Sequence, residues 1–375
     1  MALYALGSNG NGQLGVGHCD DISVPQPSLF ASPPSQPLRI LAAACGGNHS
    51  LMLVQTSPSP SSARVYCAGL ATAGACGLNS PADKVANFRP LMLFPADAVD
   101  AEDLAATPSH VAATWDASVV VFDSCRVYTL GTGSRGELGL GALSAEILRS
   151  PSATRVPNFP PPGNACVVDV AAGMAHVLVV LSGGRVFGWG AARKGQLGEP
   201  AVASVAAPRE VSLPAGFSAV RGVAGKEFSV LLSAAGEVLV LGGEKWGIKE
   251  AAPAVLQDSV DICAGWGNVY VLHADGKITA WGRNDHGQLP PKDLPPIERM
   301  AIGSEHAVCL TKDQDVVSWG WGEHGNCGPG ADEAGDVKGR FNVIASHEHV
   351  PASLKIGSVA AGCATSWVNI VPIDM

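Results

Sequence analysis

The sequence contains few charged side chains, few aromatic side chains and no run of positive charge. Charged residues make up 15% and aromatic residues 6% of the chain, and its 24 Lys and Arg are dispersed among 33 Asp and Glu, which gives a net charge of −9. Proteins that follow a phosphate backbone need clustered positive charge. We therefore expect no direct binding to nucleic acid.

Long apolar runs and paired cysteine motifs are also missing. No stretch approaches the roughly 20 apolar residues that a membrane-spanning helix requires, and a strand expected from Leu3 leaves no room for a cleaved leader. The ten cysteines include no Cys-x-x-Cys pair, which favours neither a zinc site nor a disulfide framework. We expect no membrane partner, no metal and no cofactor, and free thiols in a reducing, cytoplasmic and nuclear location.

Glycine, by contrast, is abundant, and it marks a repeat. Seven short apolar strands each end at a glycine that a second glycine-rich cluster follows. These strand-ending glycines are Gly7, Gly69, Gly131, Gly190, Gly242, Gly282 and Gly320. They stand about 40 to 60 residues apart, a period typical of propellers and repeat arrays. An earlier apolar run and a tight turn such as Gly183-Gly184 precede most of them, which predicts a β-hairpin in each repeat.

The two ends of the chain are incomplete in complementary ways. The first strand, from Leu3, has no hairpin partner, and the last apolar run, around Trp367, has no second half. Pairing them would close a ring and remove two exposed sheet edges, which otherwise promote aggregation. The sequence thus predicts an all-β fold, a closed seven-bladed β-propeller formed by residues 1–375 as one domain, with the N- and C-terminal strands completing one blade.

Motifs that suggest chemistry have simpler structural explanations. Residues 10–15 and 131–136 fit the dinucleotide pattern Gly-x-Gly-x-x-Gly, but that site needs a helix after the last glycine, and none is expected here. His347 and His349 could contact a metal, although an exposed polar loop explains them equally well. Because the repeats offer no set of nucleophile, base and orienting residue, we do not expect an enzyme.

Three histidines recur at the same place in the repeat. His49, His176 and His306 each stand three residues after a repeat glycine. The other repeats carry Ala117, Phe228, Asn268 and Thr365 at that position. A shared catalytic or metal-binding function would not tolerate such variation, so we expect these histidines to pin the blades through hydrogen bonds to neighbouring backbone.

These motifs together resemble the regulator-of-chromosome-condensation repeat family. Strands ending in Trp-Gly, Gly-Gln-Leu-Gly clusters and Gly-x-x-His segments follow one another, with close copies of the cluster at residues 12–15, 195–198 and 287–289. The resemblance covers essentially the whole chain and implies a seven-bladed propeller. The lack of a basic N-terminal tail and the opening at residues 4–9 are most similar to the fungal α-tubulin-suppressor branch.

This resemblance implies a non-catalytic adaptor that binds a small zinc- or iron-binding protein as a heterodimer. It would act indirectly with Elongator in modifying the wobble uridine of tRNA and with the enzymes of diphthamide biosynthesis. The alternative is guanine-nucleotide exchange on a small nuclear GTPase, for which residues 142–166 are the candidate wedge-like hairpin. Plant ultraviolet receptors share the architecture but depend on dense Trp and Arg clusters, so photoreception is not expected.

Hairpin geometry predicts where a partner binds. Each hairpin starts at its Gly-x-x-His end and returns to its Gly-Gln-Leu-Gly end, so both motifs should lie on one face, here called the Gly-x-x-His face. The residues expected to bind the partner there are Trp115, Asp116, Lys226, Glu227, Trp246, Trp266, Arg283, His286, Glu305 and Trp321. Trp and Arg are favoured at interface hot spots. Trp189, Trp281 and Trp319, each before a strand-ending glycine, are expected to pack between blades.

Overall fold

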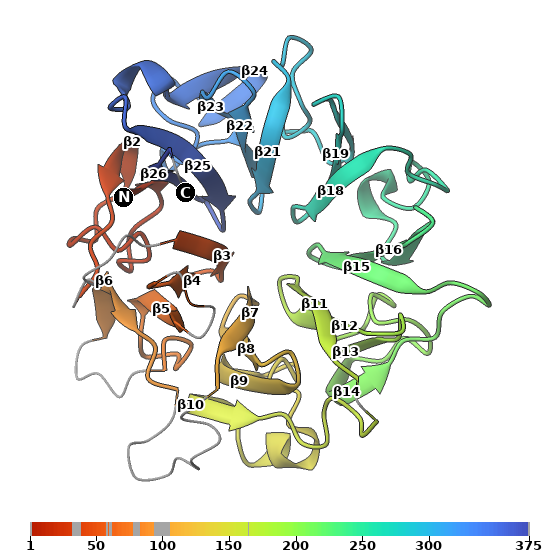
Figure 1. Cartoon of the computed structure of the whole chain (residues 1–375). Coiled ribbons are helices and arrows are strands. Elements are labelled where there is room, and N and C mark those ends of the chain that lie inside the picture. Colours follow the sequence, from red (N-terminus) through yellow and green to blue (C-terminus); the bar gives the residue numbers. More distant parts are fainter. Residues whose placement is uncertain are drawn as a thin grey trace.

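The computed structural model is a ring of seven small antiparallel sheets, or blades (Figure 1). The inner strands of the blades line a central channel. It describes residues 2–31, 39–57, 59, 62–77, 83–93, 106–163 and 165–373. The described helical segments are the short 3-10 turns η2 (Gly141–Ala145), η3 (Lys245–Gly247) and η4 (His347–His349). Within these residues, no helix has the length and apolar character needed to cross a membrane.

We number the blades in chain order and give their strands from the channel outward. Blade 1 contains β3 (Arg39–Cys45), β4 (His49–Gln55), β5 (Ala63–Leu70) and β6 (Lys84–Pro90). Blade 2 contains β7 (Pro108–Ala113), β8 (Ala117–Phe122), β9 (Arg126–Thr132) and β10 (Arg149–Arg155). Blade 3 contains β11 (Val167–Ala172), β12 (His176–Leu181), β13 (Val186–Ala191) and β14 (Ser204–Glu210).

The next two blades have only three strands each. Blade 4 contains β15 (Ala219–Ala224), β16 (Phe228–Ser233) and β17 (Val238–Gly242). Blade 5 contains β18 (Ser259–Ala264), β19 (Asn268–His273) and β20 (Ile278–Gly282). Blade 6 contains β21 (Ile297–Ile302), β22 (His306–Thr311), β23 (Val316–Trp321) and β24 (Asp336–Ala345). Blade 7 contains β25 (Leu354–Ala361), β26 (Thr365–Pro372), β1 (Ala2–Gly7) and β2 (Ile22–Pro27).

Blade 7 closes the ring as the sequence predicts. Strand β1 pairs with β26 from Ala2 opposite Ile370 to Gly7 opposite Thr365, and its other edge pairs with β2. In Figure 1 the two termini lie together in this blade. The prediction of a closed seven-bladed propeller, completed by strands from both ends, is therefore confirmed.

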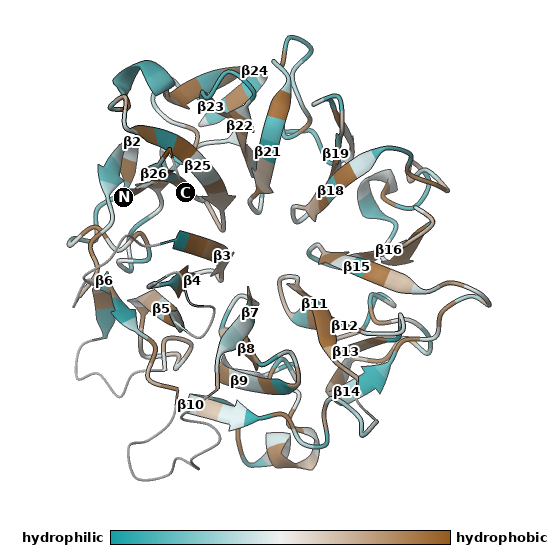
Figure 2. Cartoon of the chain, viewed as in Figure 1, coloured by the Kyte–Doolittle hydropathy of each residue, from teal (hydrophilic) through white to brown (hydrophobic). Residues whose placement is uncertain are grey.

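The strands are apolar because each blade is covered by its neighbours. In β8 and β12, for example, every residue is buried, since both faces of a second strand contact adjacent blades. In Figure 2 the outer strands β2, β6 and β14 carry much hydrophilic colour, whereas strands nearer the channel, such as β15, are mainly hydrophobic in colour. Hydrophobic burial between blades, rather than within any one of them, thus stabilises the fold.

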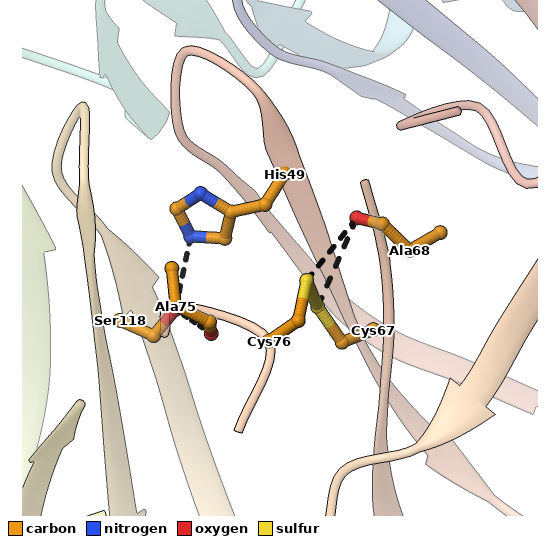
Figure 3. The surroundings of a disulfide bond; sticks show 6 residues. All are labelled: His49, Cys67, Ala68, Ala75, Cys76 and Ser118. Carbon is orange, nitrogen blue, oxygen red and sulfur yellow. Dashed lines mark hydrogen bonds between the residues drawn. A yellow bond between two sulfur atoms is a disulfide. The ribbon is translucent and has the colours of Figure 1, made fainter. Parts of the chain in front are cut away.

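The three recurring histidines link adjacent blades. The Nε2 atom of His49 lies 2.9 Å from the hydroxyl of Ser118 in the next blade, and that hydroxyl donates to the Ala75 carbonyl at 2.8 Å (Figure 3). The equivalent sets are His176, Ser229 and Gln196, and His306, Ser366 and Asn326. The expected pinning role fits this arrangement, but the partner is a serine hydroxyl of the next blade and not neighbouring backbone.

Substituting one of these histidines should weaken the ring. We expect His176→Ala to lower the free energy of unfolding by about 1 to 3 kcal/mol, because the serine loses a buried hydrogen-bond donor and a cavity forms. Urea unfolding followed by circular dichroism measures the change. The exposed His347 provides a control, whose substitution by Ala should change stability little. Unchanged stability of His176→Ala would contradict the pinning role.

The same histidines should make folding stability sensitive to mild acid. Burial lowers the pKa of His49, His176 and His306 from 6.5 to about 4. Because the unfolded chain then binds protons more readily, their contribution is complete above pH 6.5 and decreases as the pH falls toward 4. We expect a loss on the order of 2 kcal/mol per histidine at pH 5.

Urea unfolding at pH 7 and at pH 5 measures this loss. The matched control combines His176→Phe with Ser229→Val, which copies the natural pair Phe228 and Val269 at the same positions of blades 4 and 5. Its stability should depend less steeply on pH than that of the natural protein. Equal pH dependence in the two proteins would contradict the assignment to the histidines.

Three tryptophans before strand-ending glycines also connect blades. The indole N–H of Trp189 donates to the carbonyl of Glu137 at 2.7 Å, and Trp281 donates to Ile248 at 3.0 Å. Trp319 donates in the same way to Gln288 at 2.8 Å. Each acceptor lies in the connection that follows the third strand of the preceding blade, and all three side chains are buried. The prediction that they pack between blades is confirmed.

The expectation that all cysteines are free thiols is wrong for one pair. Cys67 on β5 and Cys76 in the following glycine-rich cluster form a buried disulfide, with their Cα atoms 5.5 Å apart (Figure 3). The repeat brings these two positions together in other blades too: a Cβ added to Gly188 would lie 2.5 Å from Leu197. The pairing therefore follows from blade geometry, not from a short cysteine motif. The cytoplasmic and nuclear location stays a prediction, but the argument that all cysteines are free thiols no longer supports it.

Candidate partner-binding site

The Gly-x-x-His segments and the glycine-rich clusters lie at one end of the blades, as hairpin geometry predicts. Across the hairpins, His176 is opposite Gly190, and Asn268 is opposite Gly282. The segments contact one another around the channel mouth. A Cβ added to Gly173 would lie only 2.1 Å from the carbonyl oxygen of Gly225 in the next blade, so a larger side chain would not fit there.

Backbone hydrogen bonds between blades hold the channel mouth together. The N–H of Trp115 donates to the carbonyl of Met174 at 2.9 Å, and the N–H of Lys226 donates to Trp266 at 3.0 Å. The N–H of Trp266 in turn donates to Ser304 at 2.8 Å. The side chains on this face therefore project from loops that neighbouring blades fix in place.

A pocket of about 390 Å³ opens on this face where blades 4, 5 and 6 meet. Its lining comes from the Gly-x-x-His segments of these blades and from the ends of β17 and β20. The lining residues are Lys226, Glu227, Phe228, Gly243, Lys245, Trp246, Trp266, Gly267, Arg283 and Glu305. The pocket thus combines aromatic walls with charges of both signs.

The pocket lies where the repeat is least regular. Blades 4 and 5 lack a fourth strand, and β17 and β20 are less buried than the third strand β13 of blade 3. In blade 4 the turn η3 replaces the usual cluster, and Trp246 within it adopts the left-handed φ of 68°. Phe228 replaces the histidine of the repeat, so no histidine–serine link forms between these blades. Strained backbone of this kind is concentrated at functional sites.

Cations lie over both indole rings of the pocket. The Nζ of Lys226 is 5.2 Å from the ring centre of Trp266, and the Nζ of Lys245 is 4.8 Å from that of Trp246. The guanidinium of Arg283 also lies 5.2 Å from the Trp246 ring. Cation–π contacts of this type favour defined side-chain positions. The aromatic surface continues toward the channel, because the rings of Trp115 and Trp266 are 5.5 Å apart.

An ion-pair network fixes Arg283. Its guanidinium donates to Asp285 at 2.7 Å and also to Glu305, whose other oxygen accepts from Gln288 at 2.8 Å. Burial opposes ionisation of Asp285, but hydrogen bonds from Arg283 and Gln288 outweigh it and lower the pKa of this carboxyl to about 2. Asp285 therefore carries its negative charge throughout the physiological pH range.

The structure brings together some of the predicted site residues and separates others. Lys226, Glu227, Trp246, Trp266, Arg283 and Glu305 all line the pocket. Trp115 joins them through its contact with Trp266, and both indoles also line the central channel. These positions were predictable because they follow a strand-ending glycine or a loop glycine, whose place Thr114 takes before Trp115.

The other three predicted residues lie outside the pocket. Asp116 lies toward Arg135 in blade 2, and burial raises its pKa, while the positive charge of Arg135 opposes this. His286 lies 2.9 Å from Asp336 at the start of β24. Trp321 is the last residue of β23 rather than a loop residue, and its ring meets the ring of His324 edge-on. Contacts within blade 2, within blade 6, and between blades 5 and 6 thus direct these side chains elsewhere.

Two pocket residues were not among the ten that the sequence predicts to bind the partner. Lys245 was expected on the outer part of the Gly-x-x-His face, next to Trp246, but not as a binding residue. Phe228 was noticed only as a replacement for histidine, although it is 4% exposed and lines the pocket. The signal that could have identified Phe228 was an aromatic residue at the position where other repeats carry the blade-linking histidine.

Two alternative site predictions can be compared with the structure. Residues 142–166 do not form a wedge-like hairpin in their described part, because β10 is the outer strand of blade 2 and Val156 and Phe159 are buried. His347 lies in η4, 3.2 Å from Asp315. The described residues contain no group of three or more His, Cys, Asp or Glu placed to hold a metal ion.

Comparison with known proteins supports the family resemblance. A family model described as the RCC1-like domain matches residues 2–368. An RCC1 repeat-containing protein of Schizosaccharomyces pombe, C10F6.04, is 32% identical over 98% of both chains. The secretion-regulating guanine nucleotide exchange factor of Mus musculus is 28% identical over 88% of this chain and 76% of its own. The crystal structure of Prp20p from Saccharomyces cerevisiae superposes with a TM-score of 0.81 at 21% identity, covering 99% of this chain and 92% of that one.

Proposed function

The chain belongs to the RCC1-like family, and we propose on that basis that it is a non-catalytic scaffold that holds one partner protein on its Gly-x-x-His face. The observation that carries the proposal is the pocket of blades 4 to 6, where Trp246, Trp266 and Arg283 are presented by fixed loops. Trp and Arg in a central pocket are the residue types that dominate binding energy at interfaces.

The first candidate partner is a small zinc- or iron-binding protein held as a heterodimer. The chain would then act in the cytoplasm and nucleus and would support Elongator-dependent modification of the tRNA wobble uridine and diphthamide biosynthesis. Support comes from the resemblance of the chain to the fungal α-tubulin-suppressor branch. The mixed charge and aromatic surface of the pocket also suit a small folded partner.

The second candidate is a small nuclear GTPase whose nucleotide exchange the propeller would accelerate. The name of the mouse relative supports this candidate more directly than any relative's name supports the first. In the described part of residues 142–166, β10 is the outer strand of blade 2, and Val156 and Phe159 are buried, which argues against a wedge-like hairpin. The two candidates predict different partners and different activities.

One experiment distinguishes them. Tagged protein retrieves its partner from cells of the source organism, and mass spectrometry identifies the bound protein. The purified propeller is then titrated with that partner, and it is tested for release of a fluorescent guanine nucleotide from a nuclear GTPase. Stoichiometric binding of a metalloprotein without nucleotide release supports the first candidate. Accelerated release without metalloprotein binding supports the second, and failure to retain any protein would contradict the scaffold function.

A further inference from the structure

We propose that the pocket of blades 4 to 6 receives an acidic segment of the partner that carries one apolar anchor side chain. This inference rests on the proposed scaffold function and specifies the chemistry of the partner. Three properties of the pocket support the proposal. Its rim carries cations without ion-pair partners, its interior has an apolar surface, and the faces of its aromatic rings already contact cations.

Three of the four cations in or beside the pocket have no ion-pair partner in the part of the chain that the structure describes. Lys194, Lys226 and Lys245 form no ion pair with any described part of the chain, whereas Arg283 is neutralised by Asp285 and Glu305. A Cβ added to Gly243 would lie 3.8 Å from the Cβ of Lys194, which places this lysine beside the pocket wall.

Glu227 is the lining carboxylate that remains free to oppose these three lysines. The whole chain carries a net charge of −9. Local positive charge therefore stands out on a protein that otherwise repels acidic molecules. Complementary charge of this kind attracts and orients an acidic partner.

Apolar surface inside the pocket favours an anchor side chain. Trp246 is 42% exposed although it is large and aromatic, and Phe228 contributes a buried ring to the lining. Covering exposed aromatic surface with an apolar side chain gives a favourable hydrophobic contribution. An acidic segment without such a residue would leave this surface in water.

Single-stranded nucleic acid is another polyanion that basic, aromatic surfaces bind. The contacts of the aromatic rings favour an acidic protein segment over it. Nucleobases bind by stacking on free aromatic faces. In this pocket Lys226 lies over Trp266, and Lys245 and Arg283 lie over Trp246. Base stacking would have to displace these cations, whereas carboxylates can approach them directly and complete charge-assisted hydrogen bonds.

Fluorescence anisotropy with the full chain tests the proposal. The probe is a fluorescein-labelled peptide of sequence GDEDFDEDG, and the matched peptides are GNQNFNQNG, which lacks the charge, and GDEDADEDG, which lacks the anchor. We expect the probe to bind at least about tenfold more tightly than either matched peptide at about 50 mM salt, and more weakly at about 300 mM. Equal binding of the neutral peptide would overturn the role of charge, and equal binding of the alanine peptide would overturn the role of the anchor.

Charge-reversal variants locate the binding. Lys226→Glu with Lys245→Glu should weaken probe binding at least about tenfold. The matched control, Lys277→Glu with Lys312→Glu, changes the net charge equally at the opposite end of the blades and should leave binding unchanged. Circular dichroism confirms folding of both variants. Equal losses in the two variants, or tighter binding of a labelled ten-nucleotide thymidine strand than of the peptide, would overturn the proposal.

Competition separates this inference from the function on which it rests. The probe should displace the partner protein identified by pull-down. If the partner binds and Trp246→Ala weakens it, but the acidic peptide neither binds nor competes, the acidic-segment inference fails and the scaffold function stands. If the peptide binds as expected but no protein partner is retained, the scaffold function fails instead.

Discussion

Deleting residues 1–7 should leave the chain largely insoluble and without a cooperative thermal transition. Strand β1 lies between β26 and β2, so its loss exposes the edge of β26 and detaches β2 from the sheet. Leu3, Ala5 and Leu6, which are buried in the core, are lost as well. The net stability of a folded domain is only about 5 to 15 kcal/mol, and the removal of a strand at the ring closure is expected to exceed it. The soluble fraction and differential scanning fluorimetry measure the outcome.

A complementation experiment serves as the control for this deletion. A synthetic peptide of residues 1–7, added during refolding, should restore solubility because it can supply the missing strand. A second control, Val24→Ser, changes an exposed residue of the outer strand β2 and should leave the melting temperature almost unchanged. A truncated chain that melts like the full protein would show that terminal pairing is dispensable.

The ring and its closure were predictable because they depend on local and repeated signals. Strand-ending glycines such as Gly7 and Gly190, with φ values of 116° and 102°, recur at a fixed place in every blade. The unpaired strand at each end then requires closure. By contrast, the missing fourth strands of blades 4 and 5 were not predictable, since outer strands carry no glycine motif and the segments that replace them differ.

Contacts between distant residues were less predictable than the fold. His49 and Ser118 belong to different blades, and only the assembled ring brings the hydroxyl within 2.9 Å of the imidazole. The sequence showed that the histidine recurs but not which side chain it meets. Cys67 and Cys76 were missed for a related reason, because their pairing depends on how the glycine-rich cluster folds over its own strand.

The candidate site was predictable where loops are short and regular. Lys226 and Trp266 follow a loop glycine directly, and the fixed geometry of the loop directs them to the Gly-x-x-His face. His286 lies in the regular glycine-rich cluster after β20, but its imidazole is 2.9 Å from the carboxylate of Asp336, which belongs to a strand of the next blade. Side chains held by tertiary hydrogen bonds therefore remain beyond a prediction that uses only the repeat.

Partner binding should depend strongly on the two pocket tryptophans. We expect Trp246→Ala with Trp266→Ala to weaken the complex by at least about 2 kcal/mol, or roughly 30-fold in Kd, because both rings supply apolar contact at the centre of the surface. Isothermal titration calorimetry with the purified partner measures the affinity. Trp281→Ala would not be informative, since that ring is buried between blades and its loss would destabilise the fold.

The control for this pair is Asp275→Ala, an exposed change in the β19–β20 turn of blade 5, at the end opposite the pocket. It should leave both stability and affinity unchanged. If the partner is the metalloprotein, cells with the double variant should show less wobble-uridine modification and less diphthamide. If the partner is the GTPase, the same variant should instead slow nucleotide release. Wild-type affinity in a folded double variant would exclude this pocket as the binding surface under either candidate, because binding would then not depend on its two indole rings.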